Sequence, residues 1–137
     1  EKDQSRRADF GADVRALLDQ GRLIPATDYV NAQRLRREKC REFAAVWREV
    51  DCLFTPATPL PAPKIEETTV ELGGRRVDVR LAATRFVRPF NVLGLPALSM
   101  PCGSSSRGLP LGLQIAGRSF DEATVLRVSA ALEDHGI

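Results

Sequence analysis

The chain has 137 residues, of which 43% are hydrophobic and 28% are charged, a composition close to the average of globular proteins and long enough for one domain. Its 20 basic and 18 acidic residues are mostly interspersed, so the net charge of +2 provides no one-sided basic field for nucleic acid. No apolar run approaches the roughly 18 to 20 residues that span a bilayer, and the first residues form no hydrophobic signal core. We therefore expect a cytoplasmic protein that binds neither nucleic acid nor membranes.

The cysteines and the histidine are too few and too scattered for a metal site. Cys40, Cys52 and Cys102 are odd in number, no C-x-x-C motif occurs, and the single histidine, His135, stands near the carboxyl end. A structural zinc site needs about four such ligands, at short spacings within each pair. We expect reduced, buried thiols and neither a metal nor an organic cofactor.

The first third of the chain is predicted to be helical. Apolar residues at helical spacing predict a short helix from about Ala12 to Gln20, which Gly21 would end in the left-handed conformation. A second helix is expected over roughly residues 27–50, with Thr27 or Asp28 accepting its free amide groups. At 1.5 Å per residue this helix would be about 35 Å long, so it needs a packing partner along its length.

The middle of the chain combines a short strand, a proline-rich segment and a hairpin. Residues 52–55 (CLFT) form an apolar run typical of a buried strand, and PATPLPAP after it must be extended. This proline segment is interpreted either as a rigid linker or as a loop that lines a cleft. Alternation of apolar and polar residues on both sides of Gly73 and Gly74 predicts a hairpin with a glycine turn.

The last third predicts helices and strands in alternation. Residues 81–94 have a helical pattern that Pro89 would kink or restart, while Asn91, Gly94 and Pro96 resemble a helix end and a turn into a buried strand. Strands are expected at residues 97–100 and 111–117, and Asp121 should cap a final helix that ends at Gly136. These elements together predict an α/β or α+β fold.

Three consecutive serines, Ser104 to Ser106, lie between glycines in the segment that joins the last two strands. A serine nucleophile needs a base within hydrogen-bonding reach and donors for the developing oxyanion. The sequence has no Gly-x-Ser-x-Gly elbow, and serine is a common turn residue because its hydroxyl bonds to nearby backbone. We interpret these serines as a surface turn and expect no catalytic residue in the chain.

Several blocks of the sequence, in order, resemble the carboxyl-terminal portion of the amidase signature hydrolases. They are DYVNAQRLRREKCREFAAVWREVDCLFTPATPLPAPKI, TRFVRPFNVLGLPALSMPCG, GLPLGLQIAG and SFDEATVLRVSAALE. The resemblance covers most of the chain from about Asp9 onward. It implies that residues 1–137 are the carboxyl-terminal segment of one α/β amidase signature domain, in which a mixed β-sheet is flanked by α-helices.

The resemblance also implies a reaction. Members of this family cleave carboxamides to an acid and ammonia through a serine acyl-enzyme, with a second serine on a cis peptide and a lysine as helpers. Those residues lie in an amino-terminal part with a GGSSGGS-like signature, which is absent from this sequence. The chain alone is therefore expected to be inactive, to expose apolar surface, and to dimerise or aggregate.

Substrate-binding residues are carried over from two segments that border the cleft in the family. The TP-x-x-P loop here contains Thr58, and the segment before Pro-Phe-Asn contains Thr84 and Val87. Val87 stands where many members have threonine, which implies a more apolar pocket. Amidotransferase subunits typically have an acid near the position of Thr84, so its absence here favours a plain amidase.

Three functions remain open at this stage. The favoured one is part of an amidase that acts on a small or aryl carboxamide. The first alternative is the amide-hydrolysing component of a glutamine-dependent amidotransferase, which works in a complex on a tRNA-bound acid. The second is a non-catalytic interaction module derived from a truncated amidase.

Overall fold

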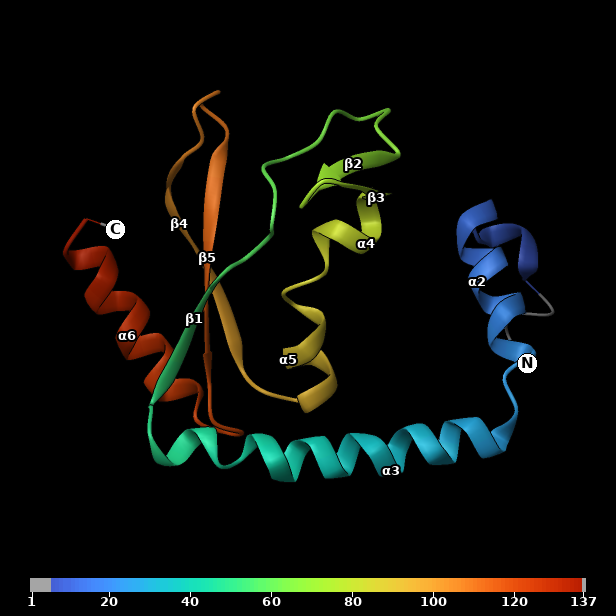
Figure 1. Ribbon diagram of the computed structural model, residues 1–137, viewed down its shortest axis with the longest axis horizontal. Coiled ribbons are helices and arrows are strands. Elements are labelled where there is room, and N and C mark those ends of the chain that lie inside the picture. Colours follow the sequence, from blue (N-terminus) through green and yellow to red (C-terminus); the bar gives the residue numbers. More distant parts are fainter. Residues whose placement is uncertain (1–5, 137) are drawn as a thin grey trace. The chain divides into compact units, whose positions relative to one another are not determined.

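The computed structural model describes residues 6–136 and is a mixed α/β structure (Figure 1). These residues form two compact units, one up to Glu38 and the other from Lys39 onward. Among them, no helix combines the length and the apolar character needed to cross a bilayer.

The first unit contains the short 3-10 helix η1 (Arg7–Asp9), α2 (Ala12–Arg22) and most of α3 (Ala26–Phe43). Arg7 ties η1 to α2 through two bonds to the carboxylate of Asp19, at 2.9 and 2.6 Å. These two hydrogen bonds lower the pKa of Asp19 below its usual value, because a guanidinium donor stabilises the ionised carboxylate. The predicted left-handed stop at Gly21 is wrong: α2 continues through Gly21 to Arg22.

The long helix differs from its prediction at both ends. It begins at Ala26, so that Thr27 and Asp28 lie in its first turn, and it ends at Phe43 rather than near residue 50. After Phe43 the chain forms the 3-10 helix η2 (Val46–Arg48). The aromatic rings of Phe43 and Trp47 pack edge to face, with their centroids 5.8 Å apart. No residue of α3 is fully buried, and Cys40 and Phe43, near its end, are half-buried.

The second unit is built on a three-stranded antiparallel sheet. Its strands are β1 (Cys52–Pro56), β4 (Ala97–Ser104) and β5 (Pro110–Gly117), in the order β1-β5-β4. The predicted strands are confirmed, and β4 and β5 are longer than expected. Residues that pair across an antiparallel sheet share one face, so Phe54, Ile115 and Leu98 lie on one face and Thr55, Gln114 and Ser99 on the other.

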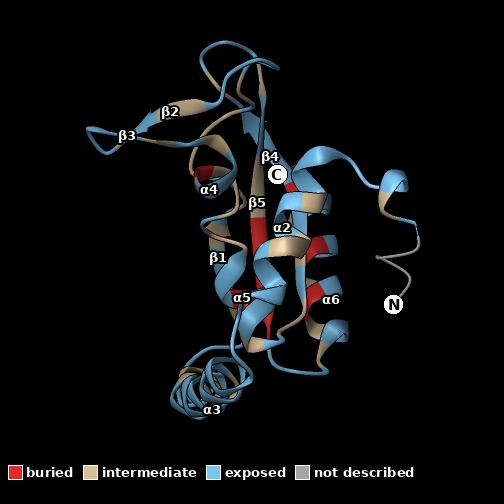
Figure 2. Ribbon diagram, turned by 90° about the vertical axis from the view of Figure 1, so that its right-hand side faces the viewer, coloured by how far each residue is buried: buried red, intermediate tan, exposed pale blue. Residues whose placement is uncertain are grey.

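The core lies between the first of these faces and α6 (Glu122–Asp134). Met100, Ile115 and Val125 are its buried members, and Ile115 is completely shielded from solvent. Figure 2 shows buried residues along β5 and on α6, with further buried residues on α4 and α5. The predicted cap is confirmed, because the Asp121 carboxylate accepts a bond from the backbone N–H of Thr124.

A hairpin and two short helices precede β4. The hairpin of β2 (Thr69–Leu72) and β3 (Arg75–Asp78) turns at Gly73 and Gly74, both with positive φ, as predicted. The helical stretch after it is broken into α4 (Val79–Ala83) and α5 (Arg88–Leu93), and Pro89 lies in the first turn of α5, as expected of a restart. Gly94 then ends α5 at φ 70°, a left-handed conformation that glycine adopts without a Cβ clash.

Candidate functional site

The polar face of the sheet brings together the two segments that were expected to border a cleft. Gln114, in the central strand β5, has only 4% of its surface exposed. Its side-chain amide Nε2 donates to Thr55 Oγ1 at 2.9 Å and to the backbone carbonyl of Phe86 at 3.2 Å. Thr55 opens the TP-x-x-P loop and Phe86 lies in the TRFVRPFN segment, so one buried side chain links both.

Hydrogen-bonding chemistry fixes the orientation of this amide. The Phe86 carbonyl can only accept, so the nitrogen of Gln114 rather than its oxygen must face it. The same nitrogen contacts Thr55 Oγ1, which makes the threonine oxygen an acceptor in that bond. No sequence motif marks Gln114, although strand alternation with Leu113 and Ile115 places it on the opposite face of the sheet.

A cavity of about 290 Å³ lies at the end of the sheet, where the side chains of Phe54, Pro56 and Leu113 share the face opposite to that of Thr55 and Gln114. It contains Thr58, one of the three predicted substrate-binding residues. The Thr58 hydroxyl donates to the backbone carbonyl of Leu60 at 2.7 Å, so in this conformation it presents only lone pairs. The walls are mostly apolar and are formed by Phe54, Thr55, Pro56, Thr58, Cys102, Leu111, Gly112 and Leu113.

The other two predicted substrate-binding residues do not line this cavity. The Thr84 hydroxyl donates to the backbone carbonyl of Arg80 at 2.7 Å, one turn earlier. Val87 is half-buried at the amino-terminal boundary of α5, next to the Phe86 carbonyl that Gln114 binds. The structure thus links the segments of Thr58 and Val87 through Gln114 but does not bring all three side chains into one cavity.

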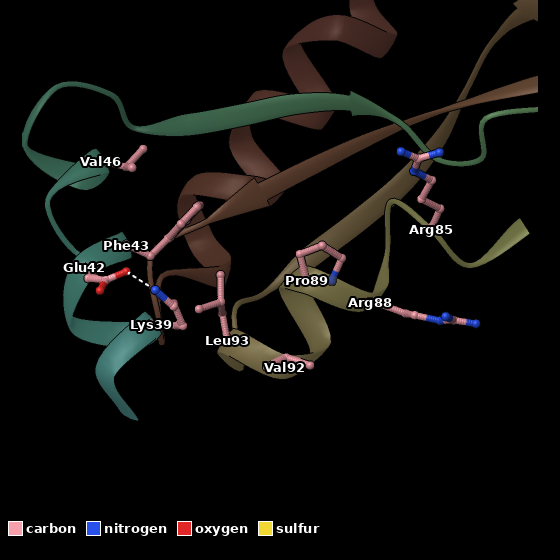
Figure 3. A pocket seen from close by; sticks show the side chains of 9 residues that line it. All are labelled: Lys39, Glu42, Phe43, Val46, Arg85, Arg88, Pro89, Val92 and Leu93. Atoms are coloured by element: carbon pink, nitrogen blue, oxygen red, sulfur yellow. Dashed lines mark hydrogen bonds and ion pairs between the residues drawn. The ribbon is translucent and has the colours of Figure 1, made fainter. Parts of the chain in front are cut away.

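A second, larger cavity of about 590 Å³ lies between the end of α3 and α5. Its apolar walls include Phe43, Pro89 and Val92. In Figure 3, Lys39 is paired with Glu42 at 2.8 Å on one side, and Arg85 and Arg88 flank the opposite side. The Cys40 thiol, in α3, donates a weak hydrogen bond to the backbone carbonyl of Leu93, in α5, at 3.6 Å.

Ser104 ends β4, where it pairs with Pro110, and Ser105 and Ser106 lie in the predicted turn between β4 and β5. The Ser105 hydroxyl accepts a bond from the backbone N–H of Leu109 at 3.1 Å, and the two backbones are joined at 2.8 Å. This is the local bonding expected of a turn serine.

The cysteines differ in exposure. Cys40 and Cys52 are half-buried and Cys102 is exposed, so the expectation of buried thiols is wrong for Cys102, which lies in the part of β4 that extends beyond the core. Burial raises the pKa of Cys52, with smaller contributions in the same direction from Asp51 and Asp121. Residues 6–136 contain no cluster of three or more His, Cys, Asp or Glu side chains able to hold a metal ion.

Comparison with known proteins identifies the family. The amidase family model matches residues 2–126, so the chain belongs to the amidase family. A crystal structure of an amidase superposes on 97% of this chain with a TM-score of 0.89 and 32% sequence identity, over 30% of its own length. The predicted family and the α/β fold class are both confirmed.

Curated relatives include two kinds of enzyme. A fatty acid amide hydrolase of Medicago truncatula is 42% identical over 121 residues, 88% of this chain and 20% of that protein. A glutamyl-tRNA(Gln) amidotransferase component of Granulibacter bethesdensis is 42% identical over 137 residues, 96% of this chain and 26% of that protein. The chain thus spans about a fifth to a quarter of the length of these relatives.

Proposed function

We propose that this chain is the carboxyl-terminal part of an amidase that hydrolyses a carboxamide C–N bond to an acid and ammonia. The observation that carries the proposal is the family match over residues 2–126, which includes both segments joined by Gln114. In this account the chain supplies a sheet, a supporting helix and part of the wall of the acyl-group pocket.

The reacting groups are proposed to lie outside these residues. Amide hydrolysis through an acyl-enzyme needs a nucleophile, a proton carrier and oxyanion donors held together. Ser105 is engaged in local turn structure through the bond that its hydroxyl accepts from the backbone N–H of Leu109, and Ser104 belongs to β4. The serine, the second serine and the lysine of the amidase signature would come from the remainder of the domain, and no cofactor is required. Without such a unit the rate typically falls by about 10⁶-fold, so the chain alone should be inactive.

The alternative is the amide-hydrolysing component of a glutamine-dependent amidotransferase. The amidotransferase component of Granulibacter bethesdensis and the fatty acid amide hydrolase of Medicago truncatula are both 42% identical to this chain, so sequence identity does not separate the two functions. We favour the amidase because Thr84 stands where an acid would hold the amino group of glutamine. Threonine carries no negative charge, and the Thr84 hydroxyl donates its proton to the Arg80 carbonyl.

The test is to purify the full-length gene product and measure ammonia release from simple carboxamides, including benzamide and hexanamide, without partner proteins. The amidase proposal expects turnover under these conditions. Turnover that requires partner proteins and charged tRNA would support the amidotransferase, and no turnover in either assay would leave the non-catalytic module.

A further inference from the structure

The backbone carbonyl of Phe86 lies at the entry of α5 and receives its hydrogen bond from a distant strand. The residue three positions further on is Pro89, which has no N–H to donate. The backbone bond that opens α5 runs from the N–H of Asn91 to the carbonyl of Val87, one residue after Phe86. Among the described residues, Gln114 Nε2 is therefore the one donor bonded to the Phe86 carbonyl, at 3.2 Å.

The sheet holds Gln114 firmly enough to act as an anchor. Gln114 lies in the central strand β5, is only 4% exposed, and donates from the same Nε2 to Thr55 Oγ1 of the neighbouring strand β1 at 2.9 Å. An amide nitrogen has two hydrogens, so these two bonds use both of them. No residue within 6–136 donates to Gln114 Oε1, which leaves the whole link to the nitrogen. The sheet thus sets where the Phe86 carbonyl lies.

We propose that Gln114 is a positioning residue that holds Val87 and the start of α5 in place for binding of the acyl group of the substrate. Val87 directly follows Phe86, is half-buried, and is one of the predicted substrate-binding residues. Because Gln114 itself is buried, it acts through the Phe86 carbonyl. This inference rests on the proposed amidase function, and the acyl group it implies is apolar at this point, since valine offers only methyl groups.

The kinetic experiment removes the link in the full-length gene product. Gln114→Met keeps the length of the side chain and loses both bonds. It should raise KM for benzamide and hexanamide about tenfold, the effect of about one hydrogen bond, while kcat changes by less than about threefold. A displaced pocket wall weakens the binding of substrate and transition state alike, which appears in KM. The matched control is Gln20→Met, at an exposed position of α2, which should change neither constant.

Gln114→Glu tests the donated bond itself, because it replaces the donating nitrogen by an oxygen at nearly constant size. The pairing neighbours Thr55 and Ser99 carry no charge, and burial raises the pKa of a carboxyl group. Above that pKa the carboxylate faces the Phe86 carbonyl, and KM should be raised. Below it the protonated carboxyl can donate one bond, so the ratio of variant to native KM should fall as the pH falls. The same ratio for Gln20→Glu should stay constant.

A second pair of variants covers the case in which the Gln114 variants do not fold. Thr55→Val removes the acceptor that holds the amide, whereas Thr55→Ser retains it. The valine should raise KM several-fold, and the serine should leave KM near the native value.

Hydrogen exchange at the start of α5 provides a readout that does not depend on turnover. Amides of residues 84–93 should exchange faster in Gln114→Met than in the native protein, whereas those of α6, on the opposite face of the sheet, should not. Saturating hexanamide should slow exchange of residues 84–93 in the native protein and several-fold less in the variant.

The two proposals fail in different ways. If the native protein hydrolyses no carboxamide, the amidase is refuted, and protection of residues 84–93 by hexanamide that depends on Gln114 still supports the positioning role. Absence of that protection in such a protein overturns the role. In an active enzyme, an unchanged KM in the Gln114 variants overturns it, as does a raised KM in Gln114→Glu that does not recover in acid.

Discussion

Gly117, at the end of β5, faces Val125 of α6 so closely that a Cβ on the glycine would lie 2.5 Å from Val125 Cγ2. Helix and strand are therefore in contact with no room for a methyl group. Gly117→Ala should destabilise the fold by about 1 to 3 kcal/mol through overpacking. Urea unfolding followed by circular dichroism measures the change.

The matched control is Gly21→Ala in α2, where a Cβ would meet nothing within 4 Å. Because Gly21 lies inside the helix, this change should stabilise by about 0.5 to 1 kcal/mol. If Gly117→Ala were as well tolerated as Gly21→Ala, the close packing of α6 on β5 would be wrong.

Ile115 is the centre of the core and is fully shielded from solvent. Ile115→Ala should cost about 2 to 5 kcal/mol, because it removes buried methyl groups and leaves a cavity. Leu126 is the control, because it lies on the same helix as Val125 but is 57% exposed. Leu126→Ala should change the free energy of unfolding by less than about 0.5 kcal/mol. Similar losses at both positions would contradict the placement of the core.

Phe120 holds a left-handed backbone conformation, with φ at 63°, and the residue is 95% exposed. A Cβ in this conformation costs roughly 1 to 2 kcal/mol, and the exposed ring contributes little in return. Phe120→Gly should therefore raise the free energy of unfolding by up to about 1 kcal/mol, whereas Phe120→Ala, which keeps the Cβ, should not. An equal effect of the two changes in thermal unfolding would exclude relief of strain.

Cys52 should show a pH dependence that follows from its raised pKa. The raised value means that the folded state favours the protonated thiol, so this stabilisation is present below the ordinary value of 9.0 and is lost as the pH rises through the folded pKa. The Cys52→Ala variant should lack this decline above pH 9. Unfolding midpoints from pH 7 to 10.5 would show it.

Alkylation provides an independent measure of the same environment. At pH 8, Cys102 should react with N-ethylmaleimide faster than Cys52, because Cys102 is exposed and Cys52 is a half-buried thiol with little thiolate. Asp51→Asn should accelerate Cys52 only modestly, since burial is the larger cause of its shift. A Cys52 that reacts first would contradict the burial.

Local signals explain what could be predicted from the sequence. The paired glycines 73 and 74, the cap at Asp121 and the stop at Gly94 each act within a few residues, and each appears where it was expected. Gly21 has the same local signature, yet α2 runs through it, because a glycine permits the left-handed conformation without requiring it.

Long-range contacts explain what could not be predicted. Gln114 is 59 residues from Thr55 and 28 residues from Phe86, so alternation could place it on a face of the sheet but could not name its partners. The end of α3 at Phe43 also depends on packing, because the helical pattern of apolar residues continues beyond it. Thr58, Thr84 and Val87 stay predictions as substrate-binding residues.

The most direct test of the central claim is an amide hydrolysis assay on the purified 137-residue chain beside the full-length gene product. The account predicts ammonia release only from the latter, with Ser104, Ser105 and Ser106 replaceable by alanine without loss of turnover. Turnover by the 137-residue chain alone, abolished by the same triple replacement, would contradict it.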